Sequence, residues 1–146
     1  MHFFQLRMLP PGVNLALLLL RLGCGLSLLL LHGWAKLTSY SALSAKFADP
    51  WGLGSATTLG LSIFAEVVCS ALLVIGLFTR FAALVCAINL AAALYYVHHL
   101  RLAGENNGEL AFVYLLGFLA ILFAGPGRFA VDSQIGRPRE VSAVER

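Results

Sequence analysis

Charged side chains are scarce in this sequence. Only 12% of its 146 residues are Asp, Glu, Lys or Arg, and 60% are hydrophobic, whereas soluble domains have about 25% charged and about 45–50% apolar residues. So few charges cannot cover a surface that faces water, which excludes an ordinary soluble enzyme. With ten Lys and Arg in all, the sequence gives no argument for a nucleic-acid partner. We expect a lipid bilayer to cover most of the chain.

Cysteines are also few, and none is arranged as a redox pair. Cys24, Cys69 and Cys86 lie inside apolar stretches, and no CxxC motif is present. The odd number argues against a dedicated dithiol enzyme. We expect small buried side chains between helices, with redox or disulfide chemistry as the alternative.

What the sequence does contain is four long apolar runs, at residues 13–37, 56–78, 81–100 and 109–124. A bilayer core of about 30 Å needs about 20 helical residues, and lipid forbids unpaired backbone groups, so these runs should be helices. The fourth run is shorter, and Pro126 ends it. The first run is too long for a signal peptide. The sequence predicts one all-α domain over residues 1–146, an integral membrane four-helix bundle with a frayed tail at 136–146.

Four spans put both termini on the same side of the membrane. The basic residues on that side are Arg7, Arg80, Arg128, Arg137, Arg139 and Arg146, and those on the opposite side are Lys36, Lys46 and Arg101. Because cytoplasmic segments carry the excess of Lys and Arg, we expect both termini in the cytoplasm. In a bacterium, the location would be the inner (plasma) membrane, crossed several times.

Ionisable groups inside the spans form two expected layers. Ionisable side chains in lipid are costly, so they face the bundle interior and find partners. Counting helical rise from the cytoplasmic ends places Arg21, Glu66 and Asn89 at one depth, near the membrane centre. The simplest interpretation is a structural ion pair of Arg21 with Glu66, helped by Asn89. A ligand or proton site is the alternative.

The second layer lies toward the outer ends of the helices. This layer would bring proton donors and a counter-charge to one apolar opening at the outer end of the bundle. Its members are His32, Lys36, His98 and Glu109. A quinone carbonyl or a small anion would fit such an opening, since imidazole titrates near neutral pH. Two alternatives stay open: the side chains hydrate at the interface, or His32, His98, His99 and Glu105 hold a metal. No spacing compels a metal site, and we expect none.

Read in order, the polar and glycine positions resemble the DoxX family of small bacterial membrane proteins. The matching pieces are Arg21, His32-Gly33-Trp34-Ala35-Lys36-Leu37, Glu66, Gly76-Leu77-Phe78-Thr79-Arg80, His98, Glu109, Gly125-Pro126-Gly127-Arg128 and Asp132. The resemblance covers roughly residues 14 to 135 and implies a four-helix membrane fold. It also implies association with oxidoreductases that pass electrons to quinone, because the founding member is similar to a small subunit of thiosulfate:quinone oxidoreductase. Other relatives are linked to thiol and oxidative-stress defence.

Two functional hypotheses follow from this resemblance. In the first, the chain is a small membrane subunit or partner of a quinone-linked oxidoreductase, with other membrane or soluble redox subunits as partners. In the second, it is a non-catalytic anchor or assembly subunit whose buried polar groups only fix the helix register. A small transporter is a third, weaker interpretation. The sequence carries no haem, flavin or iron–sulfur motif, so an electron carrier other than quinone would belong to a partner.

Overall fold

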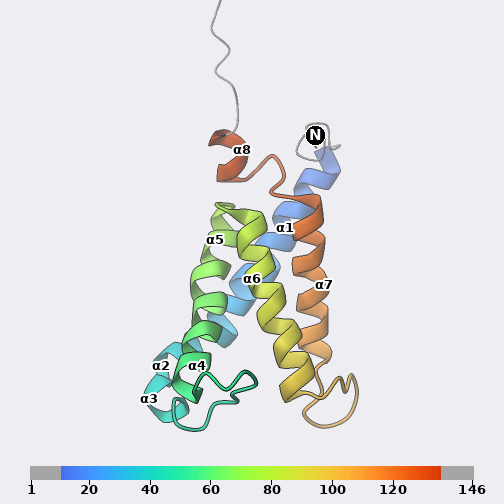
Figure 1. Ribbon diagram of the computed structural model, residues 1–146. Helices are drawn as coiled ribbons and strands as arrows, with labels where there is room; N and C mark the ends of the chain where they lie inside the picture. Colours follow the sequence, from blue (N-terminus) through green and yellow to red (C-terminus); the bar gives the residue numbers. More distant parts are fainter. Residues whose placement is uncertain (1–10, 136–146) are drawn as a thin grey trace, which may run out of the picture.

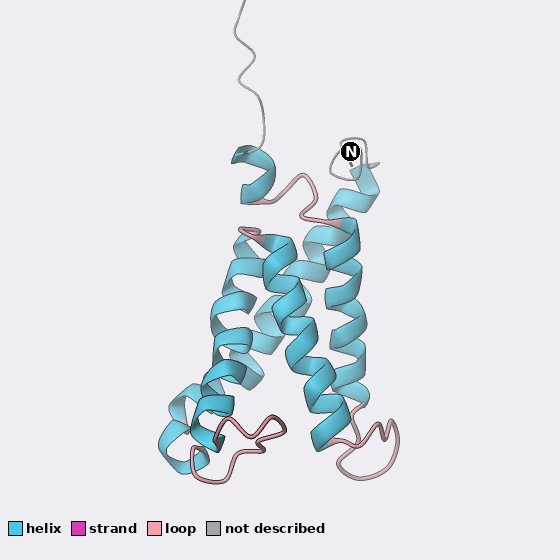
Figure 2. Cartoon of the chain, viewed as in Figure 1, coloured by secondary structure: helices cyan, strands magenta, loops and turns pink. Residues whose placement is uncertain are grey.

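The computed structural model describes residues 11–135, and within this range every regular element is a helix (Figures 1 and 2). Four long helical spans run side by side. Span 1 is α1 (Pro11–Ser27), η1 (Leu28–Gly33) and α2 (Trp34–Thr38). Span 2 is α4 (Ser55–Ile63), η2 (Phe64–Cys69) and α5 (Ser70–Ile75). Span 3 is α6 (Thr79–Ala92) and η3 (Ala93–Val97), and span 4 is α7 (Glu109–Ala124).

Two short helices complete the described chain. These are α3 (Tyr40–Leu43) and α8 (Val131–Ile135). The start of α1 and α8 lie at one end of the bundle, here called the terminal end, and the 39–54 and 98–108 segments lie at the other, the loop end (Figure 1). The predicted frayed tail at 136–146 falls outside the described residues.

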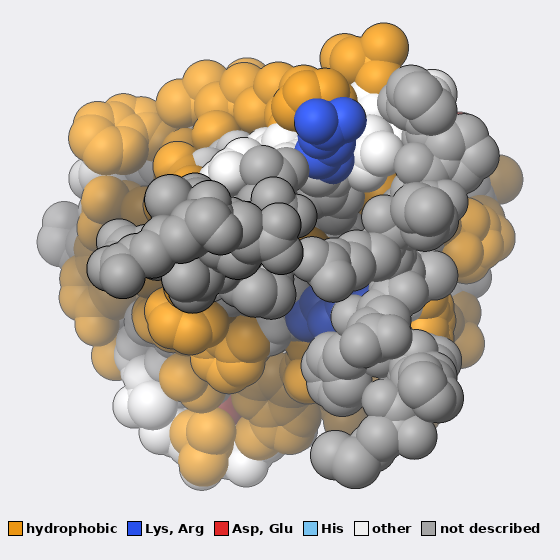
Figure 3. Space-filling view, turned by 90° about the horizontal axis from the view of Figure 1, so that it is seen from above, with side chains coloured by type: hydrophobic (Ala, Val, Ile, Leu, Met, Phe, Trp, Pro, Cys, Tyr) orange, Lys and Arg blue, Asp and Glu red, His pale blue; other side chains and the backbone are white. Residues whose placement is uncertain are grey.

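Length and surface agree with a membrane-spanning bundle. Spans 1, 2 and 3 are apolar over 27, 21 and 19 residues, long enough to cross a bilayer, and α7 is a shorter apolar helix. Large hydrophobic side chains, such as Leu19, Leu31 and Phe123, point outward and are exposed. Seen onto the terminal end, hydrophobic side chains surround the rim, with basic side chains on the face (Figure 3). The predicted all-helical four-span membrane bundle is confirmed.

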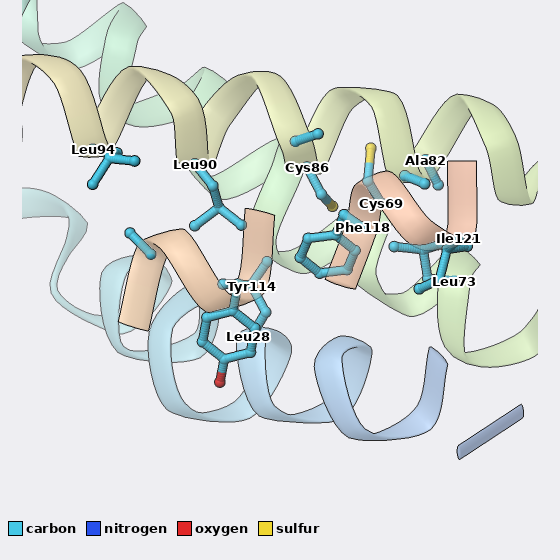
Figure 4. Close-up of a cluster of buried hydrophobic side chains, with 13 residues drawn as sticks. Leu28, Cys69, Leu73, Ala82, Cys86, Leu90, Leu94, Tyr114, Phe118 and Ile121 are labelled. Carbon is cyan, nitrogen blue, oxygen red and sulfur yellow. The ribbon is translucent and has the colours of Figure 1, made fainter. Parts of the chain in front are cut away.

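The core draws small and large side chains from all four spans. Leu28, Leu73, Cys86 and Phe118 each come from a different span and are essentially inaccessible (Figure 4). α6 and α7 share the most extensive helix–helix contact. A cavity lies between the spans toward the loop end.

Spans 2 and 3 each end three residues earlier than the sequence pattern predicts. Gly76 has a left-handed backbone (φ +75°), and its amide and that of Leu77 close back on Leu72 O. A left-handed glycine is the common way to stop a helix, whereas hydropathy continues through Leu77 and Phe78. Span 3 stops before His98 and His99, which leave the helix as the chain turns into the 98–108 segment.

At the terminal end, Asp132 stabilises the turn between α5 and α6 through hydrogen bonds. Its Oδ1 accepts a hydrogen bond from Phe78 N (2.9 Å) and its Oδ2 one from Thr79 N (2.8 Å), while Asp132 N donates to Gly76 O (3.0 Å). The first amides of a helix have no partner within the helix, so a carboxylate from a distant segment satisfies them. The α8 segment is thereby fastened across the end of the bundle.

Candidate functional site

A cavity of about 310 Å³ opens between the loop-end halves of the spans. Its apolar wall consists of Leu28, Leu90, Ala93, Leu110 and Ala111. Its polar wall consists of His32, Lys36, Glu66, His98, Asn107 and Tyr114. Every span contributes, and the mixture of apolar surface with a few polar groups is typical of ligand sites, whose volumes run from about 300 to 1,000 Å³.

Gly33 sets the distance between spans 1 and 2 at this level. A Cβ added to Gly33 would lie 2.7 Å from Glu66 O and 2.9 Å from Val67 Cγ2. A Cβ carbon essentially never makes contacts that short, so only glycine fits beside the backbone of η2. The close approach brings Lys36, three residues further along span 1, within reach of Glu66.

An ion pair between Lys36 and Glu66 forms the polar wall at this crossing. Lys36 Nζ bonds Glu66 Oε1 and also donates to Ser62 Oγ (3.0 Å). Asn89 Nδ2 donates to the same Oε1 from span 3 (3.0 Å). The Lys36 side chain is 26% exposed and that of Glu66 only 4%. Three spans are therefore joined through one nearly inaccessible carboxylate oxygen.

The predicted ion pair of Arg21 with Glu66 is wrong. In the described part of the chain, Glu66 pairs with Lys36, and Arg21 Nη2 donates instead to Phe129 O (2.9 Å). The reason is the direction of helical side chains, which tilt toward the N-terminus of their helix. Helix register adds to this, because the Glu66 backbone adjoins Gly33, about 18 Å of helical rise beyond Arg21. Span 1 begins at the terminal end and span 2 at the loop end, so the tilt carries the two side chains further apart. Asn89 does contact Glu66.

Arg21 instead belongs to the terminal end. Its side chain is 1% exposed, and it occupies the space that glycine leaves at position 76, where an added Cβ would lie 2.1 Å from Nη1. Its bond to Phe129 O connects span 1 to the segment that leads into α8. Arg21 is therefore remote from the cavity and closes the opposite end of the bundle.

Two histidines and a tyrosine face the ligand space. His32 packs edge-on against Tyr114, with ring centroids 5.9 Å apart, and the Tyr114 hydroxyl is hydrogen-bonded to Ser27 Oγ. His98 Nδ1 lies 3.0 Å from Asn106 O. A carbonyl only accepts, so Nδ1 carries the proton, and Nε2 of the neutral ring is an acceptor. The two imidazoles and the phenol give the cavity three groups that can exchange protons with a ligand.

Glu109 does not join these groups, and its predicted place in the site is wrong. Its side chain is exposed, and the described cavity wall does not include it. Glu109 is two residues before Ala111, about 200° around the helix from the buried face. The level of Glu109 along the bundle was estimated well, but the face of α7 that it occupies was not.

Tyr114, like Asn107, is a polar site residue that the sequence interpretation missed. The buried face of α7 consists of Ala111, Tyr114, Gly117, Phe118 and Ile121, which recur three or four residues apart. That spacing is the signature of one helical face, and Tyr114 is the polar member of the stripe. Because α7 is apolar on all sides, its hydropathy pattern does not indicate which face is buried.

The three π-helical segments coincide with the cavity. η1 contains Leu28 and His32, η2 contains Glu66, and η3 contains Ala93, all of which line it. A π-helical turn rotates the following side chains relative to a regular helix, and such turns are frequent at functional sites. Their clustering at one level is independent support for a functional role of the cavity.

Neither metal ligands nor thiols gather here. Within residues 11–135, no three His, Cys, Asp or Glu side chains are grouped to hold a metal ion. Cys69 and Cys86 are buried in the core, where Cys86 Sγ donates to Ala65 O (3.2 Å). Cys24 is partly buried and lies where it limits the space beside Gly117. The cysteines serve as small packing groups in the described fold.

A helical bundle of this length and apolar surface, with a polar cavity between its spans, defines a multi-pass integral membrane protein. The chain belongs to the DoxX family, whose model matches residues 16–99. This match covers spans 1 to 3, including His32, Lys36, Glu66 and His98, and ends before Glu109 and Asp132. The chain is also 34% identical over 110 residues to an uncharacterized protein of Haemophilus influenzae, which covers 72% of this chain and 80% of that protein. No solved structure matches it significantly.

Proposed function

We propose that this protein is a quinone-binding membrane subunit of an oxidoreductase, with the quinone headgroup in the loop-end cavity. The observation that supports this most is the composition of the cavity wall. An apolar slot of about 310 Å³ accepts a ring-sized headgroup, and His32, Lys36, His98 and Tyr114 border it. A bound quinone accepts electrons and protons, and a site for it needs proton donors beside apolar surface.

The residues of this chain would act on the two ring oxygens. The imidazoles of His32 and His98 can pass protons to and from the ring oxygens as general acid–base groups. The Lys36 ammonium is fixed by Ser62 and Glu66 and stabilises negative charge as it develops on an oxygen. Electrons would come from a redox partner, because a quinone site by itself only receives them.

The anchor hypothesis has one observation in its favour. The Lys36–Glu66–Asn89 contacts join three spans, which is what a group that only fixes the helix register would do. A purely structural network, however, does not need two histidines and a tyrosine around an adjoining cavity. The two hypotheses differ in whether the cavity binds quinone.

The orientation proposed with this function puts both termini in the cytoplasm and the cavity mouth on the outer side. The distribution of Lys and Arg supports it. A maleimide that cannot cross membranes should label an Ala45→Cys variant in intact cells and label Ser142→Cys only after lysis. Labelling of position 142 before lysis, with position 45 protected, would reverse the orientation.

The binding proposal predicts that quinone copurifies with the full chain in mild detergent. Substituting both cavity histidines, His32→Asn and His98→Asn, should lower the quinone content about tenfold or more, since asparagine is shorter, lacks the ring Nε2 and cannot exchange a proton with the ligand. Quinone extracted from a known amount of protein and quantified by chromatography measures this.

His99→Asn is the matched control for that experiment. It changes the neighbouring histidine, which does not line this cavity, and asparagine tolerates its left-handed backbone (φ +49°). We expect wild-type quinone content in the control. Equal content in the cavity variants and the control would reject the site and leave the anchor hypothesis.

A further inference from the structure

One oxygen of the buried carboxylate at the cavity has no partner. Glu66 Oε1 receives Lys36, Ser62 and Asn89. Its other oxygen, Oε2, is buried without a hydrogen bond to any of residues 11–135. The Glu66 residue is 3% exposed and lines the cavity. Oε1 therefore accepts from three donors and Oε2 from none. The hydrogen bonding of this carboxylate is satisfied only when another molecule donates to Oε2.

An unpartnered buried acceptor is costly, and a charged one more so. The terminal torsion of glutamate is broad, so a small rotation can present Oε2 to a molecule in the cavity. That molecule must bring an O–H or N–H donor, because an ionised carboxylate only accepts. Beside it, Lys36 Nζ has a third N–H in addition to those on Ser62 and Glu66. The pair therefore offers an acceptor and a donor next to each other.

A hydroxyl group matches this pair, and a carbonyl does not. A hydroxyl donates to Oε2 through its hydrogen and accepts from Lys36 through its oxygen. A carbonyl oxygen accepts from Lys36 but leaves Oε2 without a partner. We propose that the cavity selects the reduced, hydroquinone form of its ligand over the oxidised quinone, with Glu66 Oε2 as the acceptor that distinguishes them. This inference rests on the proposed function and adds which redox form the site prefers.

The test is equilibrium binding of decylubiquinol and decylubiquinone to the purified full chain under anaerobic conditions. Wild-type protein should bind the quinol about tenfold more tightly, the usual effect of one hydrogen bond to a charged group. In Glu66→Gln, an amide that can donate replaces the carboxylate, so the preference should disappear or reverse. Equal binding of the two forms by wild-type protein, or tighter binding of the quinone, would overturn the inference.

Two controls accompany that variant. Glu109→Gln makes the same chemical change on an exposed glutamate outside the cavity wall and should keep the preference. Ser62→Ala removes a donor to Oε1 and an acceptor of Lys36 but leaves Oε2 unchanged, and it should also keep the preference. If either control loses the preference as fully as Glu66→Gln, the assignment to Oε2 is wrong.

The outcomes separate this inference from the proposed function. Binding of both forms with equal affinity leaves a quinone site without redox preference, so the proposed function stands and the inference fails. Binding of neither form rejects both. The wild-type ratio decides the inference even where Glu66→Gln does not fold.

Discussion

Gly33→Leu should destabilise the bundle by about 3 kcal/mol or more, at the upper end of overpacking effects. A Cβ at position 33 already falls 2.7 Å from Glu66 O, and the neighbour is helical backbone rather than a flexible side-chain end. Spans 1 and 2 must therefore separate, which also breaks the contact of Lys36 with Glu66. Unfolding in mixed detergent micelles, followed by circular dichroism, measures the loss.

Gly23→Leu is the control in the same span. A Cβ at Gly23 meets nothing within 4 Å, so a leucine there adds only lipid-facing surface. Gly33→Ala should fall between the control and Gly33→Leu, because its single methyl group makes the same clash with less volume. Equal stability of the two leucine variants would mean that spans 1 and 2 do not approach as described.

Lys36→Met should cost about 3–5 kcal/mol, the usual effect of leaving a buried charge without its partner. The reverse change, Glu66→Leu, should cost less. Glu66 is 4% exposed and keeps only the neutral donors Ser62 and Asn89 when Lys36 is lost, whereas Lys36 is 26% exposed and can hydrate. The difference between the two losses follows from the different burial of the two side chains. It is measured by comparing the unfolding free energies of the two single variants.

The double variant Lys36→Met/Glu66→Leu completes the cycle. Apolar replacement of both partners of a buried pair is often neutral or stabilising, so most of the lost stability should return. Its quinone content then distinguishes the two functional hypotheses. A stable double variant without quinone indicates that the pair serves binding, and a stable variant with wild-type quinone content indicates that it serves packing. Additive losses with no recovery would contradict the ion pair itself.

The fold was largely predictable because a membrane imposes a simple rule. Length and hydropathy identify four helices, and the number of spans places both ends of the described chain together. The helix ends were less accessible to prediction, since Gly76 stops span 2 through its backbone conformation while the apolar pattern continues. The π-helical segments leave no signature in composition and could not be predicted.

The site was predicted in part, and the errors have two physical causes. Depth along the bundle was counted from backbone positions, which paired Arg21 with Glu66. The Glu66 backbone in fact adjoins Gly33 rather than Arg21, and the tilt of helical side chains toward the N-terminus brings Lys36 to Glu66. Depth alone also says nothing about the face of a helix, so Glu109 was included and Tyr114 was not. Combining depth, tilt and face would have selected Lys36, Glu66 and Tyr114.

The most direct test of the central claim is to map where a quinone binds. A photoreactive azidoquinone, irradiated with the purified full chain, should label peptides from η1, from the end of span 3 with His98, and from the loop-end half of α7. Excess unmodified quinone should suppress that labelling. The proposal predicts the modified residues at the cavity wall, around His32, His98 and Tyr114. Labelling confined to the lipid-facing surface or to the terminal end near Arg21, and insensitive to competing quinone, would contradict it.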